Sequence, residues 1–386
     1  TLRSTYTDQF DSERGRALLQ EALALAEALD DRRAQAKIYW NLMLQSNFGE
    51  FDAQQIVAYG ETAVAIAREE NLREVLAYAL NDLARPYTQI GEMEKAENVL
   101  EESGRLWREL GNRPMLADNR ATLASGLHYL GRLEEGLELV NEALNISQAV
   151  GSYWGQTYSL NILGPIYMEL GRIDEALQAW QQSIPMALKA NFIGGQAFVR
   201  VDMGVAYGYL GDTTRGLAIV EEAIARSGEL GQSPVAYFPL LAKARLHLYD
   251  GDVAEAAKIL DTPQLTLDMA RININASSLL INIESEVGFA AGEYAEVLVL
   301  LDDAISSAEK MGMIISLVEL GLLKGQALVG LGRVEEGTAV LAKARSMAES
   351  AGSKRLLWQI LGEMYEIEMA HGDPATAEEL RREAQE

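Results

Sequence analysis

The chain contains no cysteine and no long apolar run, and both absences exclude classes of protein. Without cysteine there can be no disulfide and no thiolate metal site. No apolar stretch approaches the ~18–20 residues that a helix needs to cross a membrane. No secretory signal is visible either. We therefore expect a cytoplasmic protein that makes no contact with a membrane.

The signature motifs of common enzymes are also missing. There is no G-x4-G-K-[ST] phosphate loop, no strand-led G-x-G-x-x-G, no H-E-x-x-H and no G-x-S-x-G. The histidines His128, His247 and His371 lie far apart in sequence, so they show no metal-binding spacing. The sequence predicts no catalytic residue, no metal and no cofactor, and we expect that this chain is not an enzyme.

Basic residues are scarce relative to acidic ones. Lysine and arginine number 33 against 57 aspartates and glutamates, which gives a net charge of −24. Such a field repels a phosphate backbone, so we expect no binding to nucleic acid. Two interpretations of the acidic surface remain open: it keeps the solvated faces soluble, or it docks a basic partner.

What the sequence does contain is a long repeat. A glycine recurs at intervals of 40 residues, with a single interval of 41. Small side chains predominate five and twelve residues after each of these glycines, and positions seven apart share one helix face. Small residues on one face allow a neighbouring helix to approach closely, so the pattern predicts stacked helical hairpins. The glycines are Gly91, Gly131, Gly171, Gly211, Gly251, Gly292, Gly332 and Gly372.

The clearest copy of the repeat, residues 158–183, carries a recognisable motif. Its key residues are Leu163, Gly164, Tyr167, Gly171, Ala176 and Trp180. This L-G-x2-Y, G, A-x3-aromatic pattern resembles the tetratricopeptide repeat, although that family has a period of about 34 residues. HEAT and armadillo arrays share the longer period, but they would not be expected to show this motif.

The resemblance implies an all-α, right-handed α-solenoid superhelix of about nine helix-turn-helix repeats. Arrays with repeats of this length resemble the sensor domains of bacterial signal-transduction ATPases with numerous domains. In that family the ATPase lies in an upstream domain, which would account for the missing phosphate loop here.

We expect a single solenoid domain over residues 1–386, because each repeat of a solenoid contacts only its neighbours. A partial repeat occupies residues 1–30, and residues 233–272 form an irregular repeat. The chain begins at Thr1 inside a helical pattern, so we infer that it is part of a larger multidomain protein.

Prolines fall at several positions inside the expected helices. Pro86, Pro165 and Pro239 are expected to interrupt the first helices of their hairpins. A proline inside a helix costs about 3 kcal/mol. In the irregular repeat Pro263 follows the second helix closely, so we expect that helix to break near Asp261.

The candidate binding residues lie on the first helices, which line the inner surface in the resembled family. Positions thirteen, ten and six before each turn glycine share one helix face. With neighbouring polar residues they give a concave-face set for a ligand or partner: Tyr78, Asn81, Arg85, Asp118, His128, Tyr158, Asn161, Phe198, Asp202, Phe238, Arg245 and Asn282.

Other roles for these side chains remain open. The aromatic rings could pack against the preceding helix, and the asparagines could cap helices or bind water. In peptide-binding members of the family, inner asparagines hold the backbone of the ligand. The carboxylate-clamp type is excluded because it needs several inner cations, and these columns provide only Arg85 and Arg245.

Two functions fit this pattern. The first is the sensor domain of a bacterial signalling regulator, which binds a small-molecule or peptide inducer in its groove and contacts other domains of the same protein. The second is a scaffold that binds a partner protein without any small ligand.

Overall fold

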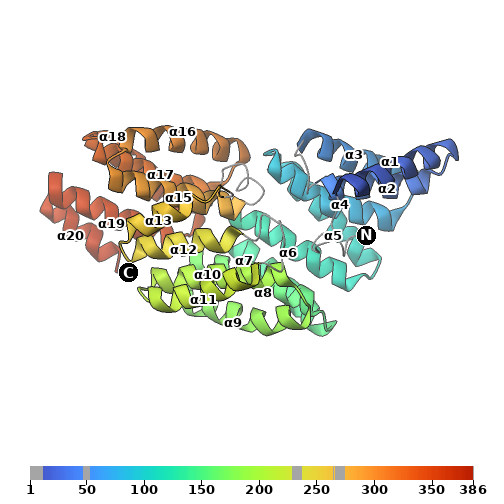
Figure 1. Ribbon diagram of the computed structural model, residues 1–386, viewed down its shortest axis with the longest axis horizontal. Helices are drawn as coiled ribbons and strands as arrows, with labels where there is room; N and C mark the ends of the chain where they lie inside the picture. The colour runs from blue at the N-terminus through green and yellow to red at the C-terminus, as the bar shows by residue number, and fades with distance from the viewer. Residues whose placement is uncertain (1–11, 47–52, 228–236, 264, 266–273, 386) are drawn as a thin grey trace. The chain divides into compact units, whose positions relative to one another are not determined.

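The computed structural model describes residues 12–46, 53–227, 237–263, 265 and 274–385. Within these ranges the chain forms nineteen helices and no strand, which confirms the all-α solenoid (Figure 1). None of the helices in the described ranges is both long enough and apolar enough to span a membrane.

In the described ranges, nine helical hairpins follow the first helix, α1 (Ser12–Ala28). The hairpins are α2 (Arg32–Ser46) with α3 (Ala53–Glu69), α4 (Arg73–Gln89) with α5 (Met93–Glu109), α6 (Arg113–Tyr129) with α7 (Leu133–Ala149), α8 (Tyr153–Glu169) with α9 (Ile173–Lys189), α10 (Ile193–Tyr209) with α11 (Thr213–Ser227), α12 (Phe238–Tyr249) with α13 (Val253–Leu260), α15 (Ile274–Ala291) with α16 (Tyr294–Met311), α17 (Ile314–Gly330) with α18 (Val334–Ala351), and α19 (Lys354–His371) with α20 (Pro374–Glu383).

In seven of the nine hairpins the turn depends on a glycine with positive φ. Seven of the eight turn glycines, all except Gly372, have φ between 72° and 85°, a left-handed conformation that side chains disfavour. At Gly171 the turn is closed by two hydrogen bonds, from Gly171 N–H to the Met168 carbonyl (3.1 Å) and from Arg172 N–H to the Tyr167 carbonyl (2.8 Å). This pairing satisfies the last carbonyls of the first helix and reverses the chain.

A second left-handed series lies at seven of the described connections between hairpins and from α1 to the first hairpin. It consists of Asp30, Asn71 and Asn191, with φ between 51° and 53°, and Gly111, Gly151, Gly312 and Gly352, with φ between 65° and 70°. Glycine and asparagine tolerate this conformation better than other residues. The 40-residue period is therefore divided into two nearly equal halves.

Close helix packing explains the small residues of the repeat. The positions seven before the first seven turn glycines are all small and buried: Ala84, Ala124, Gly164, Gly204, Ala244, Ser285 and Gly325. At Gly164 an added Cβ would lie 2.2 Å from the indole of Trp180 on α9. Trp180 can occupy this space only because the facing residue, Gly164, has no side chain.

The chain divides into two compact units, and each is described here by itself. Unit 1 comprises Thr1–Gly126 with Glu138–Ser159, and unit 2 comprises Leu127–Leu137 with Leu160–Glu386. In unit 1, Tyr78 stacks on Trp40 and meets the edge of Trp107, with ring centroids 5.0 and 4.7 Å apart. Unit 2 contains core clusters around Trp180, Leu246 and Leu301.

The prolines behave differently from the prediction. α4 and α8 continue without interruption past Pro86 and Pro165, and α12 begins beside Pro239 instead of being interrupted by it. A proline in the first turn lacks only an N–H that would have no helical partner anyway. The expected break near Asp261 is confirmed, because α13 ends at Leu260 with Asp261 as its C-cap.

Candidate ligand-binding site

A cavity of about 490 Å³ lies within unit 2. It is lined by the first helices of seven consecutive hairpins, namely the end of α6 and α8, α10, α12, α15, α17 and α19, and by Trp180 on α9. Its volume falls within the range of small-ligand sites. The positions six before five successive turn glycines all face it: Pro165, Val205, Arg245, Glu286 and Gln326.

The cavity wall combines aromatic and polar side chains. The rings of Tyr209 and Trp358 meet edge to face, 6.1 Å apart, and Trp358 is 55% exposed. Phe238 and Tyr249 add two further rings from α12. Aromatic walls with a few fixed polar groups are typical of pockets that bind organic ligands.

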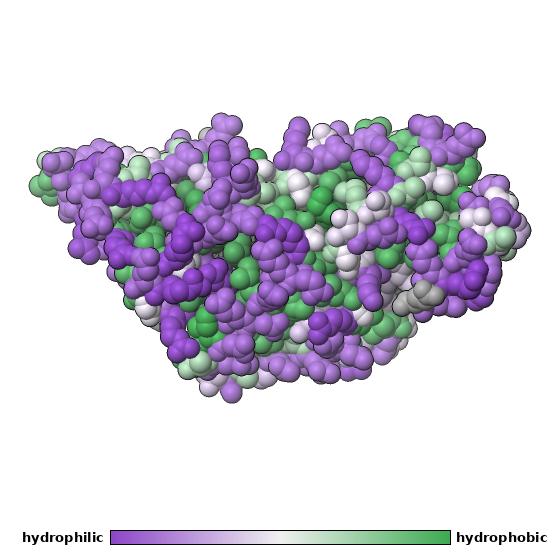
Figure 2. All heavy atoms as spheres, turned by 180° about the vertical axis from the view of Figure 1, so that it is seen from behind, coloured by the Kyte–Doolittle hydropathy of each residue, from purple (hydrophilic) through white to green (hydrophobic). Residues whose placement is uncertain are grey.

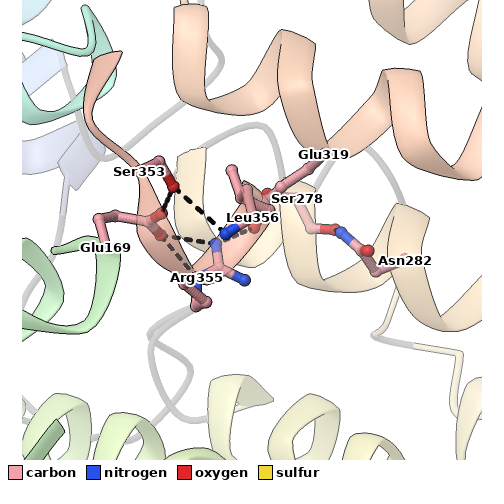
Figure 3. Close-up of polar contacts among 7 residues, drawn as sticks. All are labelled: Glu169, Ser278, Asn282, Glu319, Ser353, Arg355 and Leu356. Carbon is pink, nitrogen blue, oxygen red and sulfur yellow. Dashed lines mark hydrogen bonds and ion pairs between the residues drawn. The ribbon is translucent and has the colours of Figure 1, made fainter. Parts of the chain in front are cut away.

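A buried ion-pair network joins α8 to α19 on one side of the cavity (Figure 3). Glu169 accepts hydrogen bonds from Arg355 Nη2 (2.6 Å), Arg355 Nε (2.8 Å) and the Ser353 hydroxyl (2.5 Å). Arg355 Nη2 also donates to Glu319 on α17 at 2.6 Å. The Glu319 carboxylate is in turn held by the hydroxyl of Ser278, at 2.8 Å.

This network connects residues that are 186 positions apart in sequence. The side chain of Glu169 is only 6% exposed, and that of Arg355 is 19% exposed. Burial disfavours the charged Arg355 guanidinium, but the two carboxylates more than compensate and raise its pKa. The arginine is therefore fully charged and committed to Glu169 and Glu319.

The second cation of the cavity is also paired. Arg245 forms an ion pair with Glu286 on α15, and its guanidinium lies 4.5 Å from the centre of the Tyr249 ring. Its side chain is 13% exposed. Arg245 thus combines an ion pair with a cation–π contact, which fixes the guanidinium plane against the wall.

Asp202 on α10 differs from the other acidic residues of the cavity. It is half-buried, and within the described part of the chain its carboxylate makes no ion pair or hydrogen bond. Burial raises the pKa of Asp202 to about 7. Among the described residues, no cation compensates this carboxylate.

His128, at the end of α6, lies beside the ion-pair network. Its Nε2 is buried and has no hydrogen-bond partner among the described residues. Burial lowers the pKa of His128, and the charge of Glu169 only partly opposes this effect. The ring is therefore neutral at pH 7.

Five of the twelve predicted site residues line this cavity. They are His128, Asp202, Phe238, Arg245 and Asn282. Asn282 donates its amide N–H to the Ser278 carbonyl one helical turn earlier, at 2.8 Å.

Two further predicted residues of unit 2, Asn161 and Phe198, have internal contacts instead. The amide of Asn161 donates to the Gly195 carbonyl (3.2 Å) and accepts from the Ser183 hydroxyl (2.6 Å). It therefore ties adjacent hairpins together, whereas the sequence suggested that it holds a ligand backbone. Phe198 packs against the ring of Phe238, with centroids 5.4 Å apart.

The other five predicted residues belong to unit 1. Tyr78 is held between Trp40 and Trp107, and Arg85 is exposed. The Tyr158 hydroxyl lies 3.2 Å from that of Thr122, and its ring stacks on Trp154.

Asn81 and Asp118 form part of a polar cluster between α4 and α6. Asn81 donates to Asp118 (3.0 Å) and accepts from Asn119 (3.1 Å). Nearby, the indole of Trp40 donates to Asp82 at 2.7 Å. Burial raises the pKa of Asp82 to about 6, and burial with the charge of Asp82 raises that of Asp118 to about 7.

These two carboxyls predict a pH dependence of stability. Because burial raises the pKa of Asp118 from its usual 3.8 to about 7 in the folded state, its contribution to stability is complete below about pH 4 and is lost as pH rises through about 7. We expect Asp118→Asn, which keeps an acceptor for Asn81, to remove this loss. Allowing for solvent screening, the gain over the parent chain at about pH 8 should be roughly 1 kcal/mol.

The measurement is thermal unfolding of both proteins at about pH 5 and about pH 8. Asp303→Asn, at an exposed position on α16, serves as the control that changes charge alone. If Asp118→Asn follows the same pH profile as the control, the carboxyl does not titrate as described.

Sequence analysis missed three important residues of the site, Glu169, Arg355 and Trp358. Glu169 stands two residues before its turn glycine, and in three other repeats the residue at that position is a tyrosine that lines the cavity: Tyr129, Tyr209 and Tyr249. This recurring tyrosine could have identified the position as part of the site. No local pattern singles out Arg355, because its partner lies on a distant helix.

The face drawn in Figure 2 is mainly polar. Hydrophilic side chains cover most of the face drawn in Figure 2, with apolar groups between them. Many of the exposed acidic residues are paired with basic neighbours, as in Arg172 with Glu175 and Arg333 with Glu336. Exposed pairs of this kind contribute little to stability, about 0–1 kcal/mol each.

Comparison with known proteins finds likeness in structure alone. No family model matches the chain, and no curated protein matches its sequence. Its structure is similar to the Rap conjugation gene regulator of plasmid pLS20 in complex with the Phr* peptide, with a TM-score of 0.58 and 11% identity. That match covers 88% of this chain and 95% of the other.

Two other solved structures are similar. The apo quorum sensor NprR from B. thuringiensis gives a TM-score of 0.51 at 16% identity, covering 87% of this chain and 99% of that one. A signal-transduction ATPase with numerous domains from Pyrococcus horikoshii, which has a tetratricopeptide repeat sensor, gives 0.49 at 14% identity. There the match covers 94% of this chain and 55% of the other.

Proposed function

We propose that this array of tetratricopeptide-like hairpins is the ligand-binding part of a regulator, and that unit 2 takes a small-molecule or short-peptide inducer into its cavity. The observation that carries the proposal is the cavity itself, about 490 Å³ in volume and lined from seven successive hairpins. The similar fold of a Rap regulator in complex with the Phr* peptide supports it.

Ligand binding would act through the network that joins α8 to α19. A ligand in the cavity would touch both α8, which carries Glu169, and α19, which carries Arg355. It would therefore favour the arrangement in which Arg355 contacts Glu169. A ligand shifts a conformational equilibrium only by its differential affinity for the two states. We also propose that this array belongs to a cytoplasmic protein whose ATPase lies in another domain. The array would contact the other domains of that protein.

The test fills the cavity without disturbing the core. Gly362 on α19 lines the cavity, and a Cβ added there would meet no atom within 4 Å. We expect Gly362→Trp to fold normally and to abolish the thermal stabilisation that metabolite and random hexapeptide libraries give to the parent chain. Differential scanning fluorimetry measures both properties.

Gly126 on α6 provides the matched control. It is also a helical glycine whose added Cβ would meet nothing within 4 Å, and it belongs to unit 1. Gly126→Trp should keep the full response to the libraries. If Gly362→Trp responds as strongly as Gly126→Trp, the ligand binds elsewhere, and a scaffold role on another face would replace the sensor role.

A further inference from the structure

We propose that the ligand of the unit 2 cavity carries a cationic group, an ammonium or a guanidinium, and that Asp202 is the residue that receives it. This inference rests on the proposed function, because it defines the chemical class that the same cavity selects.

The charges of the cavity wall are the first argument. The wall contains four carboxylates, those of Glu169, Asp202, Glu286 and Glu319, and two guanidinium groups. Both guanidinium groups are occupied: Arg355 pairs with Glu169 and Glu319, and Arg245 pairs with Glu286. The wall is therefore acidic overall, and the carboxylate left over is that of Asp202.

The surroundings of Asp202 are the second argument. It lies on α10, where its neighbours one helical turn away, Val205 and Ala206, also line the cavity and are apolar. A half-buried carboxylate without a partner is unfavourable, and its raised pKa reflects that burial. A cationic group of a ligand would give the Asp202 carboxylate an ion-pair partner. The charge-assisted hydrogen bond between them would favour binding.

The aromatic rings of the wall are the third argument. The contact of Arg245 with the Tyr249 ring shows that a guanidinium is accommodated on a ring face in this cavity. Tyr209, seven positions after Asp202 on the same helix, pairs with the exposed Trp358. Rings beside an unpaired carboxylate make up the usual environment for organic cations.

An anionic ligand does not fit this wall. It would have to take Arg245 or Arg355 from its carboxylate partner, leaving a buried glutamate uncompensated. Glu169, with 6% of its side chain exposed, would be the most unfavourable case. The arrangement therefore excludes phosphates and carboxylates as the group that anchors the ligand.

The experiment compares charged and neutral probes of the same shape. Two capped hexapeptide libraries are prepared, one with arginine and one with citrulline at a fixed position, and agmatine and spermidine represent small cations. Each probe is added to the parent chain, to Asp202→Asn and to Asp303→Asn, and thermal unfolding is followed. Asp303→Asn makes the same chemical change at an exposed position outside the cavity.

We expect the arginine library or the amines to stabilise the parent chain and Asp303→Asn. The citrulline library should not stabilise either. For a single binder from the active set, calorimetry should give about tenfold or greater loss of affinity in Asp202→Asn. A response to the peptides identifies a basic peptide as the source of the cation, and a response to the amines identifies a small metabolite.

Other results would overturn the inference in different ways. If the citrulline library stabilises the parent chain as well as the arginine library and Gly362→Trp abolishes both effects, the cavity binds ligands but does not select a cation. If Asp202→Asn keeps the full response, the cation is received elsewhere. If no probe stabilises the parent chain although the metabolite or random hexapeptide libraries do, the inference fails and the proposed function stands. If those libraries also give no stabilisation, both fail.

Discussion

Replacing Arg355 by methionine is expected to destabilise unit 2 by about 3–5 kcal/mol. The substitution removes the only cation that holds Glu169 among the described residues, and it also leaves Glu319 without its ion pair. Glu169 would then be a buried charge compensated by nothing except the Ser353 hydroxyl. Removing one partner of a buried ion pair is costly because the remaining charge is not solvated by water.

Urea unfolding followed by circular dichroism measures this loss. Arg345→Met is the matched control, because Arg345 also pairs with two glutamates, Glu349 at 2.8 Å and Glu383 at 2.6 Å, in a more exposed place. We expect that control to lose less than about 1 kcal/mol.

Removing the charges of Glu169 and Glu319 should largely abolish the stability loss caused by Arg355→Met. In a protein carrying Glu169→Gln and Glu319→Gln, the further change Arg355→Met should have a much smaller effect, because no buried charge is left behind. If Arg355→Met alone costs no more than the Arg345 control, the network does not stabilise unit 2.

Replacing Gly164 by alanine is expected to cost about 2–3 kcal/mol, although alanine is the better helix former. An added Cβ would lie 2.2 Å from the Trp180 indole, and Trp180 is 2% exposed. The indole cannot move away without displacing the rest of its core cluster, which includes Ala176 and Met203. The penalty comes from overpacking a closely filled interface.

Thermal unfolding of a double-mutant cycle tests this account. Trp180→Phe creates room, so Gly164→Ala should cost much less in that background than in the parent chain. Gly126→Ala, at a helical glycine with open space, should instead gain roughly 0.5–1 kcal/mol from helix propensity. A similar loss at both glycines would mean that close approach to Trp180 is not the cause.

The sequence by itself determined the elements and their order. The 40-residue interval between glycines placed the turns, because only a residue that tolerates positive φ can end a helix and reverse the chain at once. Small residues such as Gly164 and Ala176 then marked the faces that touch. These features are local, so each hairpin could be predicted from its own residues.

The face that lines the cavity was also partly predictable. The position six before the turn glycine follows from helical periodicity, and it lines the cavity from Pro165 to Gln326. Which side chains on that face are available was not predictable. Asn161 and Asn81 carry amides suited to a ligand, but both amides bind neighbouring hairpins, and this depends on the exact approach of adjacent helices.

Only the tertiary structure decided the contact between Glu169 and Arg355. Their separation of 186 residues spans several hairpins, and the small rotation from each hairpin to the next accumulates over that distance. Side-chain volumes at every interface contribute to this rotation, so no local pattern encodes where α19 returns to α8. The same accumulated rotation determines which arginines are already paired. Among the described residues, it leaves Asp202 as the cavity carboxylate without a partner.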